Sequence, residues 1–291
     1  MSFQTNFTRW TSVKYFRYRN YLLLRRPDGE NRSGGELEAC CAYGKIDSPI
    51  GGMANVEWSE KYGIPLCETV EEVVEKSDVL VVLLPDNQEM HEKLCGVPLR
   101  SGKYVYIDKN FAPTRDAAVR IFEKADAFGT KCWSSSALGF ASELDGIDVS
   151  GIDAIYSEGP GEFEMYIIHQ IDPVIRLMGG VAKRAMYTGT GVHPAAVIEF
   201  DDGRIWHMCL RSDRDGSFEY TVADKENRAE RITVKSDYFG LFIDALTEFF
   251  KTGEPPIPHE RTVTVIAVRE ALIKARCKPF EWIEIEKQKQ K

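Results

Sequence analysis

Residues 78–85 read DVLVVLLP, an almost continuous apolar run of strand length. A strand covered on both faces has this composition, whereas a strand with one face in water alternates apolar and polar residues. Strand-like runs follow at KYVYIDK (103–109) and KCWSSSAL (131–138), and helix-like segments lie between them at NQEMHEKLCGVPL (87–99) and TRDAAVRIFEKADAFG (114–129). This alternation indicates right-handed crossovers and a doubly wound, Rossmann-like parallel sheet.

The segment before residue 78 continues the same α/β pattern. ELEACCAYG (36–44) is a strand candidate, and ANVEWSEKYGIP (54–65) predicts a helix that ends at Gly63. TVEEVVEK (69–76) predicts a second helix with Thr69 as its N-cap. The predicted sheet therefore begins well before the apolar run.

From about residue 152 the pattern changes to strands joined by turns, and DDGR (201–204) is a strong hairpin signal. Two helices and a short apolar end follow. The strand candidates are 152–159, 183–191, 195–212 and 217–234, and the later segments are 238–253, 262–277 and 279–285. This order predicts an α+β domain with a large, mostly antiparallel sheet.

We therefore expect three parts. A Rossmann-like dinucleotide-binding domain occupies residues 1–137, an α+β substrate and oligomerisation domain occupies 138–285, and a charged tail occupies 286–291. A site that combines residues of both domains would lie in a cleft between them.

The composition narrows the functional classes. A net charge of −8 argues against a nucleic-acid surface. The seven cysteines form no C-x-x-C and no zinc spacing, which favours reduced thiols and no metal site. The chain has neither an apolar run of about 20 residues nor a signal-peptide pattern. We expect a cytoplasmic protein that acts on a small molecule, without membrane contact.

The first 34 residues are basic, although the whole chain is acidic. Seven cationic and two acidic side chains give 7 − 2 = +5. One interpretation is a solvated basic leader, and the other is a segment that engages an anionic partner. The charged residues are Arg9, Lys14, Arg17, Arg19, Arg25, Arg26 and Arg32 against Asp28 and Glu30.

Lys109 lies where a buried strand ends, and ligands of doubly wound sheets bind beyond such ends. One interpretation is a structural ion pair with Asp108 or another neighbour. The other is a lysine used for proton transfer and substrate anchoring. The other strand ends carry Tyr43 and Gly44, Pro85 and Asp86, and Ser134 to Ser136.

His169 lies on the apolar, helix-like stretch EMYIIHQIDPVIRLMG (164–179). Such a histidine is either a hydrogen-bonded core residue or a functional base. Asp172 lies three residues later on the same face and is a candidate to fix the imidazole tautomer.

Several stretches resemble the Gfo/Idh/MocA family of NAD(P)-dependent oxidoreductases. They include SGKYVYIDKNFAPTRDAAVRIFEKADAFG (101–129), SSSALGFASEL (134–144) and GEFEMYIIHQIDPVIRLMGG (161–180), and the similarity in order and spacing covers residues 36–285. The resemblance implies that Lys109 lies near the nicotinamide and the substrate hydroxyl, and that His169 accepts the proton. Asp172 and Tyr166 would support them. The implied cofactor-binding residues are Tyr43, Gly44, Pro85, Asp86, Asn87, His91 and Asp108.

The resemblance implies NAD or NADP as cofactor, a sugar, inositol or related polyol as substrate, and a homodimer or homotetramer. Oxidation of a secondary alcohol needs a hydride acceptor, a base and a cation near the developing alkoxide, which the nicotinamide, His169 and Lys109 would supply. The alternative is a non-catalytic ligand-binding or interaction protein of the same fold with impaired cofactor binding.

The chain departs from the family pattern at several positions. Asn110 replaces the proline after the lysine, which predicts a trans peptide there because a cis bond before a non-proline residue costs ~3 kcal/mol. Met165 replaces an acidic residue, which leaves Asp172, Tyr166 or Glu164 as partners of His169, and Gly139 replaces an arginine.

The nucleotide-binding signals are also incomplete. No G-x-G-x-x-G precedes residue 36, so either an aberrant start displaced the usual loop or the chain binds dinucleotide poorly. Lys45 lies near the expected ribose site and is either a contact for a 2′-phosphate or an exposed loop lysine.

Overall fold

A computed structural model describes Leu37, residues 39–45, Asp47 and residues 54–83, 88–211 and 216–286. The predicted leader, Pro85, Asp86, Asn87 and the last five residues lie outside this part of the chain. The described residues form two compact units. Unit 1 comprises residues up to Ala112 with 117–134 and 243–259, and unit 2 comprises 113–116, 135–242 and the residues from 260 onward.

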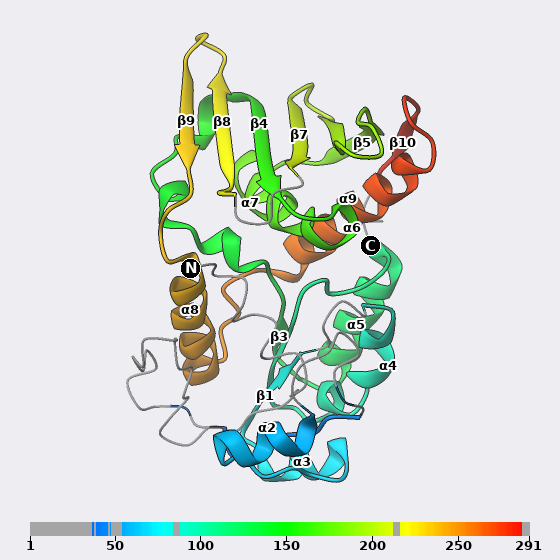
Figure 1. The fold of residues 1–291 in the computed structure, drawn as a ribbon, viewed down its shortest axis with the longest axis vertical. Coiled ribbons are helices and arrows are strands. Elements are labelled where there is room, and N and C mark those ends of the chain that lie inside the picture. Colours follow the sequence, from blue (N-terminus) through cyan, green and yellow to red (C-terminus); the bar gives the residue numbers. More distant parts are fainter. Residues whose placement is uncertain are drawn as a thin grey trace. The chain divides into compact units, whose positions relative to one another are not determined.

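The core of unit 1 is a parallel sheet in the order β1-β2-β3 (Figure 1). Its strands are β1 (Val79–Val82), β2 (Tyr104–Ile107) and β3 (Cys132–Trp133). Every residue of β1 is buried. This confirms the parallel strand that the continuous apolar run predicted.

Helices lie on both sides of this sheet. Figure 1 shows α4 (His91–Leu94) and α5 (Arg115–Ala127) on one side and α8 (Tyr238–Thr252) on the other. From α8, the Phe249 ring lies 5.7 Å from the Tyr104 ring and 6.1 Å from the Trp133 ring. This coverage explains why the strands are apolar on both faces.

The helix ends of unit 1 follow the predicted chemistry. Helix α2 (Asn55–Tyr62) ends at Gly63, whose φ of 66° is the left-handed conformation that glycine adopts without strain. Helix α3 (Val70–Lys76) begins after Thr69, whose hydroxyl accepts the Glu72 N–H at 3.1 Å.

Two predicted elements of unit 1 differ in the structure. The helix predicted over 87–99 consists of three short pieces, η2 (Gln88–Met90), α4 and η3 (Pro98–Arg100). Pro98 explains why α4 does not continue into η3, because proline lacks an N–H and restricts the residue before it. Within the described residues, the strand predicted over 36–44 makes one parallel bridge, between Ala42 and Leu66.

Unit 2 contains a seven-stranded sheet in the order β10-β5-β6-β7-β4-β8-β9. The β4–β7 pair is parallel and the other pairs are antiparallel. The predicted DDGR hairpin joins β6 to β7, with Gly203 at a φ of 88°. The strands are β4 (Ile152–Pro160), β5 (Ala182–Tyr187), β6 (Ala195–Phe200), β7 (Ile205–Arg211), β8 (Glu219–Asp224), β9 (Ala229–Thr233) and β10 (Trp282–Glu284).

One face of this sheet is buried, because alternate residues of β6 and β7 are buried and their neighbours are half-buried. Helix α7 (Ile168–Met178) packs against β4, and Figure 1 shows α6 (Phe163–Tyr166) and α9 (His259–Arg276) near it. Short helical turns lead into the sheet, namely η4 (Ala137–Phe140), η5 (Ser142–Leu144) and η6 (Val149–Gly151).

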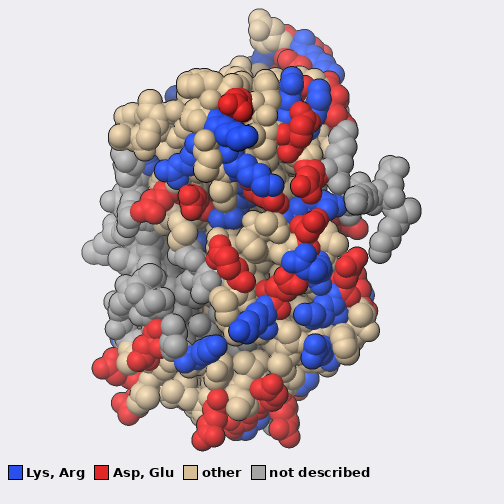
Figure 2. Space-filling view, turned by 90° about the vertical axis from the view of Figure 1, so that its right-hand side faces the viewer, with Lys and Arg blue, Asp and Glu red and all other residues tan. Residues whose placement is uncertain are grey.

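Acidic and basic side chains are intermixed over the described residues on the face in Figure 2. Within the described part of the chain, no helix is both long enough and apolar enough to cross a membrane.

Candidate functional site

Lys109 is the second residue after the end of β2 and is half-buried. Asp108 before it is 8% exposed, its N–H donates to the Val82 carbonyl at 2.9 Å, and its carboxylate accepts the Tyr106 hydroxyl at 3.4 Å. The β1–β2 pairing therefore fixes the backbone at the base of Lys109.

The peptide bond between Lys109 and Asn110 is cis, so the trans bond predicted from the sequence was wrong. That prediction considered only which residue follows the lysine, whereas Asn110 and Phe111 are each only 1% exposed. Tertiary packing decides the isomer here instead of residue type.

His91 is completely buried, and its Nδ1 lies 2.8 Å from the carbonyl oxygen of Phe111. The ring thus holds the segment that follows Lys109. His91 stays a predicted cofactor-binding residue, and this contact joins it to the segment that follows Lys109.

The Asn110 side chain is buried, and neither its amide nitrogen nor its oxygen has a hydrogen-bond partner among the described residues. An unpaired buried amide costs free energy unless another group satisfies it. A bound polar group at this end of the sheet would fit these unpaired atoms.

Gly44 lies near the end of the bridge-forming segment, and its carbonyl accepts the Asn55 side-chain amide at 3.2 Å. A Cβ on Gly44 would come within 2.5 Å of the Asn55 side chain. Gly44 therefore permits a close approach to the start of α2. Its neighbour Tyr43 is half-buried.

In unit 2, His169 lies on the first turn of α7 and is half-buried. Its Nδ1 lies 2.7 Å from the hydroxyl oxygen of Ser136, which also accepts the Leu138 N–H at 3.2 Å. The side chain that contacts Nδ1 thus belongs to a serine in the strand-like run 131–138 identified from the sequence.

Asp172 is 2% exposed and lies at the centre of a hydrogen-bond network. Its Oδ2 accepts the Ser135 hydroxyl at 2.6 Å and the Ser136 N–H at 2.8 Å. Its Oδ1 accepts Nη2 and Nε of Arg261 at 2.7 and 3.2 Å. The guanidinium offsets the buried negative charge, and each carboxylate oxygen has a donor.

Three residues of α7 face the same loop, because spacings of three and four residues share one face of a helix. His169 and Asp172 contact Ser136. Arg176 donates to the Gly139 carbonyl at 2.8 Å and forms an ion pair with Asp145. Side chains on one face of α7 thus connect this helix to the loop that carries Ser136.

Aromatic rings surround His169. The Tyr166 ring lies 5.4 Å from the imidazole and the Phe218 ring lies 6.0 Å away, both edge to face. Gly161, at a φ of 104°, makes room for Tyr166, since a Cβ there would come within 2.3 Å of the ring.

His169 and Asp172 were predicted from the sequence, whereas the contact of Ser136 with Nδ1 and that of Arg261 with Asp172 were not. The serine run at a strand end was the available signal for Ser136. Arg261 lies 89 residues after Asp172 and no spacing indicates the contact. Of the three partners that the sequence left open for the imidazole, Tyr166 contacts the ring edge to face and Asp172 binds Ser136, which in turn contacts Nδ1.

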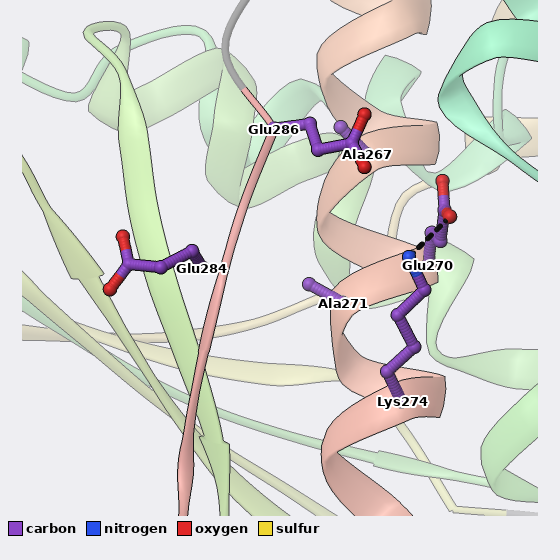
Figure 3. A pocket seen from close by; sticks show the side chains of 6 residues that line it. All are labelled: Ala267, Glu270, Ala271, Lys274, Glu284 and Glu286. Carbon is purple, nitrogen blue, oxygen red and sulfur yellow. Dashed lines mark ion pairs between the residues drawn. The ribbon is translucent and has the colours of Figure 1, made fainter.

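A small cavity lies elsewhere, between α9 and β10 (Figure 3). It measures about 10 Å³, which is room for about one water. Figure 3 shows Glu286 directed toward α9, Glu284 directed away from it, and Glu270 paired with Lys274. Because Glu270 also accepts the Arg115 N–H at 2.8 Å, it has a structural role there.

No group of three or more His, Cys, Asp or Glu side chains within the described ranges could hold a metal ion.

No family model matches the chain. No curated protein sequence matches it either. Solved structures do share its fold.

Myo-inositol 2-dehydrogenase from Lactobacillus plantarum has a TM-score of 0.70 and 12% identity, covering 86% of this chain and 92% of that one. Myo-inositol dehydrogenase from Lactobacillus casei, in complex with NAD(H) and myo-inositol, has a TM-score of 0.67 and 11% identity, covering 80% and 86%. The WlbA dehydrogenase from Bordetella pertussis, in complex with NADH and UDP-GlcNAcA, has a TM-score of 0.61 and 12% identity, covering 79% and 86%. The chain shares the fold of these structures, with a parallel sheet and a larger, mostly antiparallel sheet, which confirms the fold class predicted from its sequence.

Proposed function

We propose that this protein is an oxidoreductase that transfers a hydride between NAD or NADP and the secondary alcohol or carbonyl group of a sugar, inositol or related polyol. The environment of His169 carries the proposal. Its Nδ1 is held by Ser136, and Ser136 is held by a buried, charge-balanced carboxylate. An imidazole fixed in this way is suited to exchange a proton with a bound hydroxyl group.

Because Ser136 holds Nδ1, we assign proton transfer to Nε2 of His169. In the oxidation direction Nε2 takes the hydroxyl proton of the substrate, and in the reduction direction it returns that proton. Lys109 would place its ammonium group near the substrate oxygen and stabilise the negative charge that develops there. The Tyr166 ring, which contacts His169, would lie beside the substrate.

NAD or NADP, when bound, would supply the nicotinamide that accepts or donates the hydride. The proposed contacts come from Tyr43, Gly44 and Asp108, from the segment that His91 holds, and from Pro85, Asp86 and Asn87 outside the described residues. The unpaired amide of Asn110 supports a polar group at this end of the sheet. The structural neighbours that hold NAD(H) give independent support.

The test is nicotinamide reduction with a panel of sugars, inositols and other polyols. We expect one or more to be oxidised, and expect Lys109→Ala and His169→Ala each to lower kcat/KM by about 10²–10⁴-fold, the usual contribution of acid–base groups. Matched controls are Lys225→Ala and His193→Ala, which change exposed residues of the same types.

Unchanged rates in both site variants would refute the assigned roles. Calorimetric titration with NAD and NADP addresses the alternative of a non-catalytic protein with the same fold. Micromolar binding of either dinucleotide supports the oxidoreductase, and no binding of either one favours the alternative.

A further inference from the structure

We propose that Ser136, Asp172 and Arg261 are positioning residues for His169, a role that rests on the function proposed above. The Ser136 hydroxyl contacts the imidazole directly and lies 2.7 Å from Nδ1. Asp172 binds Ser136, and Arg261 binds Asp172, so both act on the imidazole indirectly. No motif in the sequence assigns these roles to Ser136 or Arg261.

A hydroxyl at Nδ1 suits a histidine whose Nε2 takes a proton, because the hydroxyl oxygen accepts Nδ1–H and so leaves Nε2 as the unprotonated nitrogen of the neutral ring. When Nε2 takes a proton, the substrate O–H bond breaks, an N–H bond forms, and the ring carries a hydrogen on each nitrogen. Ser136 Oγ accepts Nδ1–H before and after this step. Ser136 thus orients the ring in either state and places no net charge beside it.

Asp172 fixes the position of that hydroxyl through the backbone. Its Oδ2 accepts the Ser136 N–H at 2.8 Å, and the adjacent Ser135 hydroxyl donates to the same oxygen at 2.6 Å. A carboxylate that receives two donors at one oxygen restricts the serine pair to one conformation.

Arg261 completes the arrangement because Asp172 is almost entirely shielded from water. A buried carboxylate without a cation is costly, and the two donors of Arg261 to Oδ1 offset its charge. Gly139 leaves space for this pair, since a Cβ there would lie 3.2 Å from Asp172 Oδ2 and 3.3 Å from Arg261 Nη2.

If these contacts were purely structural, the loss of rate in Ser136→Ala would not depend on His169. A double-mutant cycle therefore separates a structural role from a positioning role. We expect Ser136→Ala to lower kcat by about 10–100-fold, the range known for hydrogen-bond partners of metal-binding histidines, with a much smaller change in KM. In the His169→Gln background the same substitution should change kcat little further. Ser136→Thr keeps the hydroxyl and should recover most of the rate, and the exposed Ser142→Ala is the matched control.

Equal losses from Ser136→Ala in both backgrounds would overturn the proposal, because they would show that the serine does not act through the histidine. Failure of Ser136→Thr to exceed Ser136→Ala would also overturn it. Arg261→Lys, which keeps the charge but loses the paired donors, should give an intermediate rate, and a wild-type rate would remove Arg261 from the proposal.

A second measurement does not depend on activity and separates this inference from the proposed function. In protein labelled with ¹⁵N-histidine, the signals of His169 can be assigned among five histidines by their loss in His169→Gln. Ser136→Ala should shift the His169 ring-nitrogen signals, while Ser142→Ala should leave them unchanged. Unshifted signals in Ser136→Ala would overturn the positioning role, whether or not a substrate is found.

Discussion

At the scale of single residues, the site depends on small side chains that leave space for charged ones. Gly139 lies in η4 with no side chain to occupy the space beside the Asp172–Arg261 ion pair. Asp172 in turn holds Ser136 by its backbone. A methyl group added at Gly139 would therefore act on His169 through a series of contacts without touching the imidazole.

We predict that Gly139→Ala destabilises the protein by about 1–3 kcal/mol, the range for adding a methyl group to a packed site. The new Cβ would crowd Asp172 Oδ2 at 3.2 Å and Arg261 Nη2 at 3.3 Å. Denaturant unfolding checks the prediction. Gly146→Ala is the control, since a Cβ there meets no atom within 4 Å. Equal stability of the two variants would show that the ion pair adjusts without cost.

The residue-level predictions from the sequence succeeded where chemistry is local. Thr69 caps its helix and Gly63 ends one, because these effects depend on a few adjacent backbone groups. The peptide isomer at Asn110 and the partner of His169 depend on residues packed from distant parts of the chain. Sequence spacing carries no signal for such contacts.

At the scale of elements, a buried polar cluster connects α7 to the sheet beneath it. The Ser157 hydroxyl of β4 donates to Gln170 Oε1 at 2.6 Å and accepts the Trp206 indole N–H of β7 at 2.8 Å. Gln170 also donates to the Cys209 carbonyl at 3.0 Å. Since Gln170 follows His169 directly, this cluster anchors the turn of α7 that carries the imidazole.

We predict that Ser157→Ala lowers the free energy of unfolding by about 2–4 kcal/mol. It leaves Gln170 Oε1 and the Trp206 N–H without this partner in a dry interior, and each such loss costs about 1–3 kcal/mol. Ser150→Ala changes an exposed serine and should have an effect within about 0.5 kcal/mol. Thermal or denaturant unfolding measures both variants, and a loss below 1 kcal/mol in Ser157→Ala would contradict the prediction.

Elements with a strong periodic pattern were predictable from the sequence, and those controlled by pairing were less so. The apolar run at β1 and the DDGR hairpin were correct because burial and turn chemistry are encoded locally. The parallel pairing of β4 with β7 joins segments that are not adjacent in the chain. The pieces of the predicted helix over 87–99 show how one proline interrupts a periodic segment.

At the scale of the whole molecule, a division of the chain into consecutive segments does not describe the two units. Residues 243–259 group with unit 1, although residues on both sides of them in the sequence belong to unit 2. The pattern of α8 gave no sign of this, because an amphipathic helix specifies an apolar face and leaves its partner undefined. Phe249 supplies the contact with Tyr104 and Trp133 that joins this segment to the first sheet.

The seven-stranded sheet has a second face, and this face is where we expect the contact of the homodimer or homotetramer that the family resemblance implies. Tyr156 on β4 is 49% exposed, and its ring stacks on that of His207 of β7. The ring centroids lie 4.9 Å apart, and the angle between the ring planes is 5°. Half-buried residues alternate along β6 and β7 on the side away from the buried positions. A second copy of the chain packed on this face would bury these side chains.

We therefore expect the particle mass in solution, measured by light scattering after size-exclusion chromatography, to be two or four times that of one chain. Tyr156→Glu should weaken association by about tenfold or more, because burying an unpaired carboxylate costs more than the 1.4 kcal/mol that a tenfold change requires. Tyr62→Glu changes a similarly exposed tyrosine of α2 and should leave the mass unchanged. A monomeric mass for the wild type at micromolar concentration would refute the oligomer, and an unchanged mass for Tyr156→Glu would place the contact on a different surface.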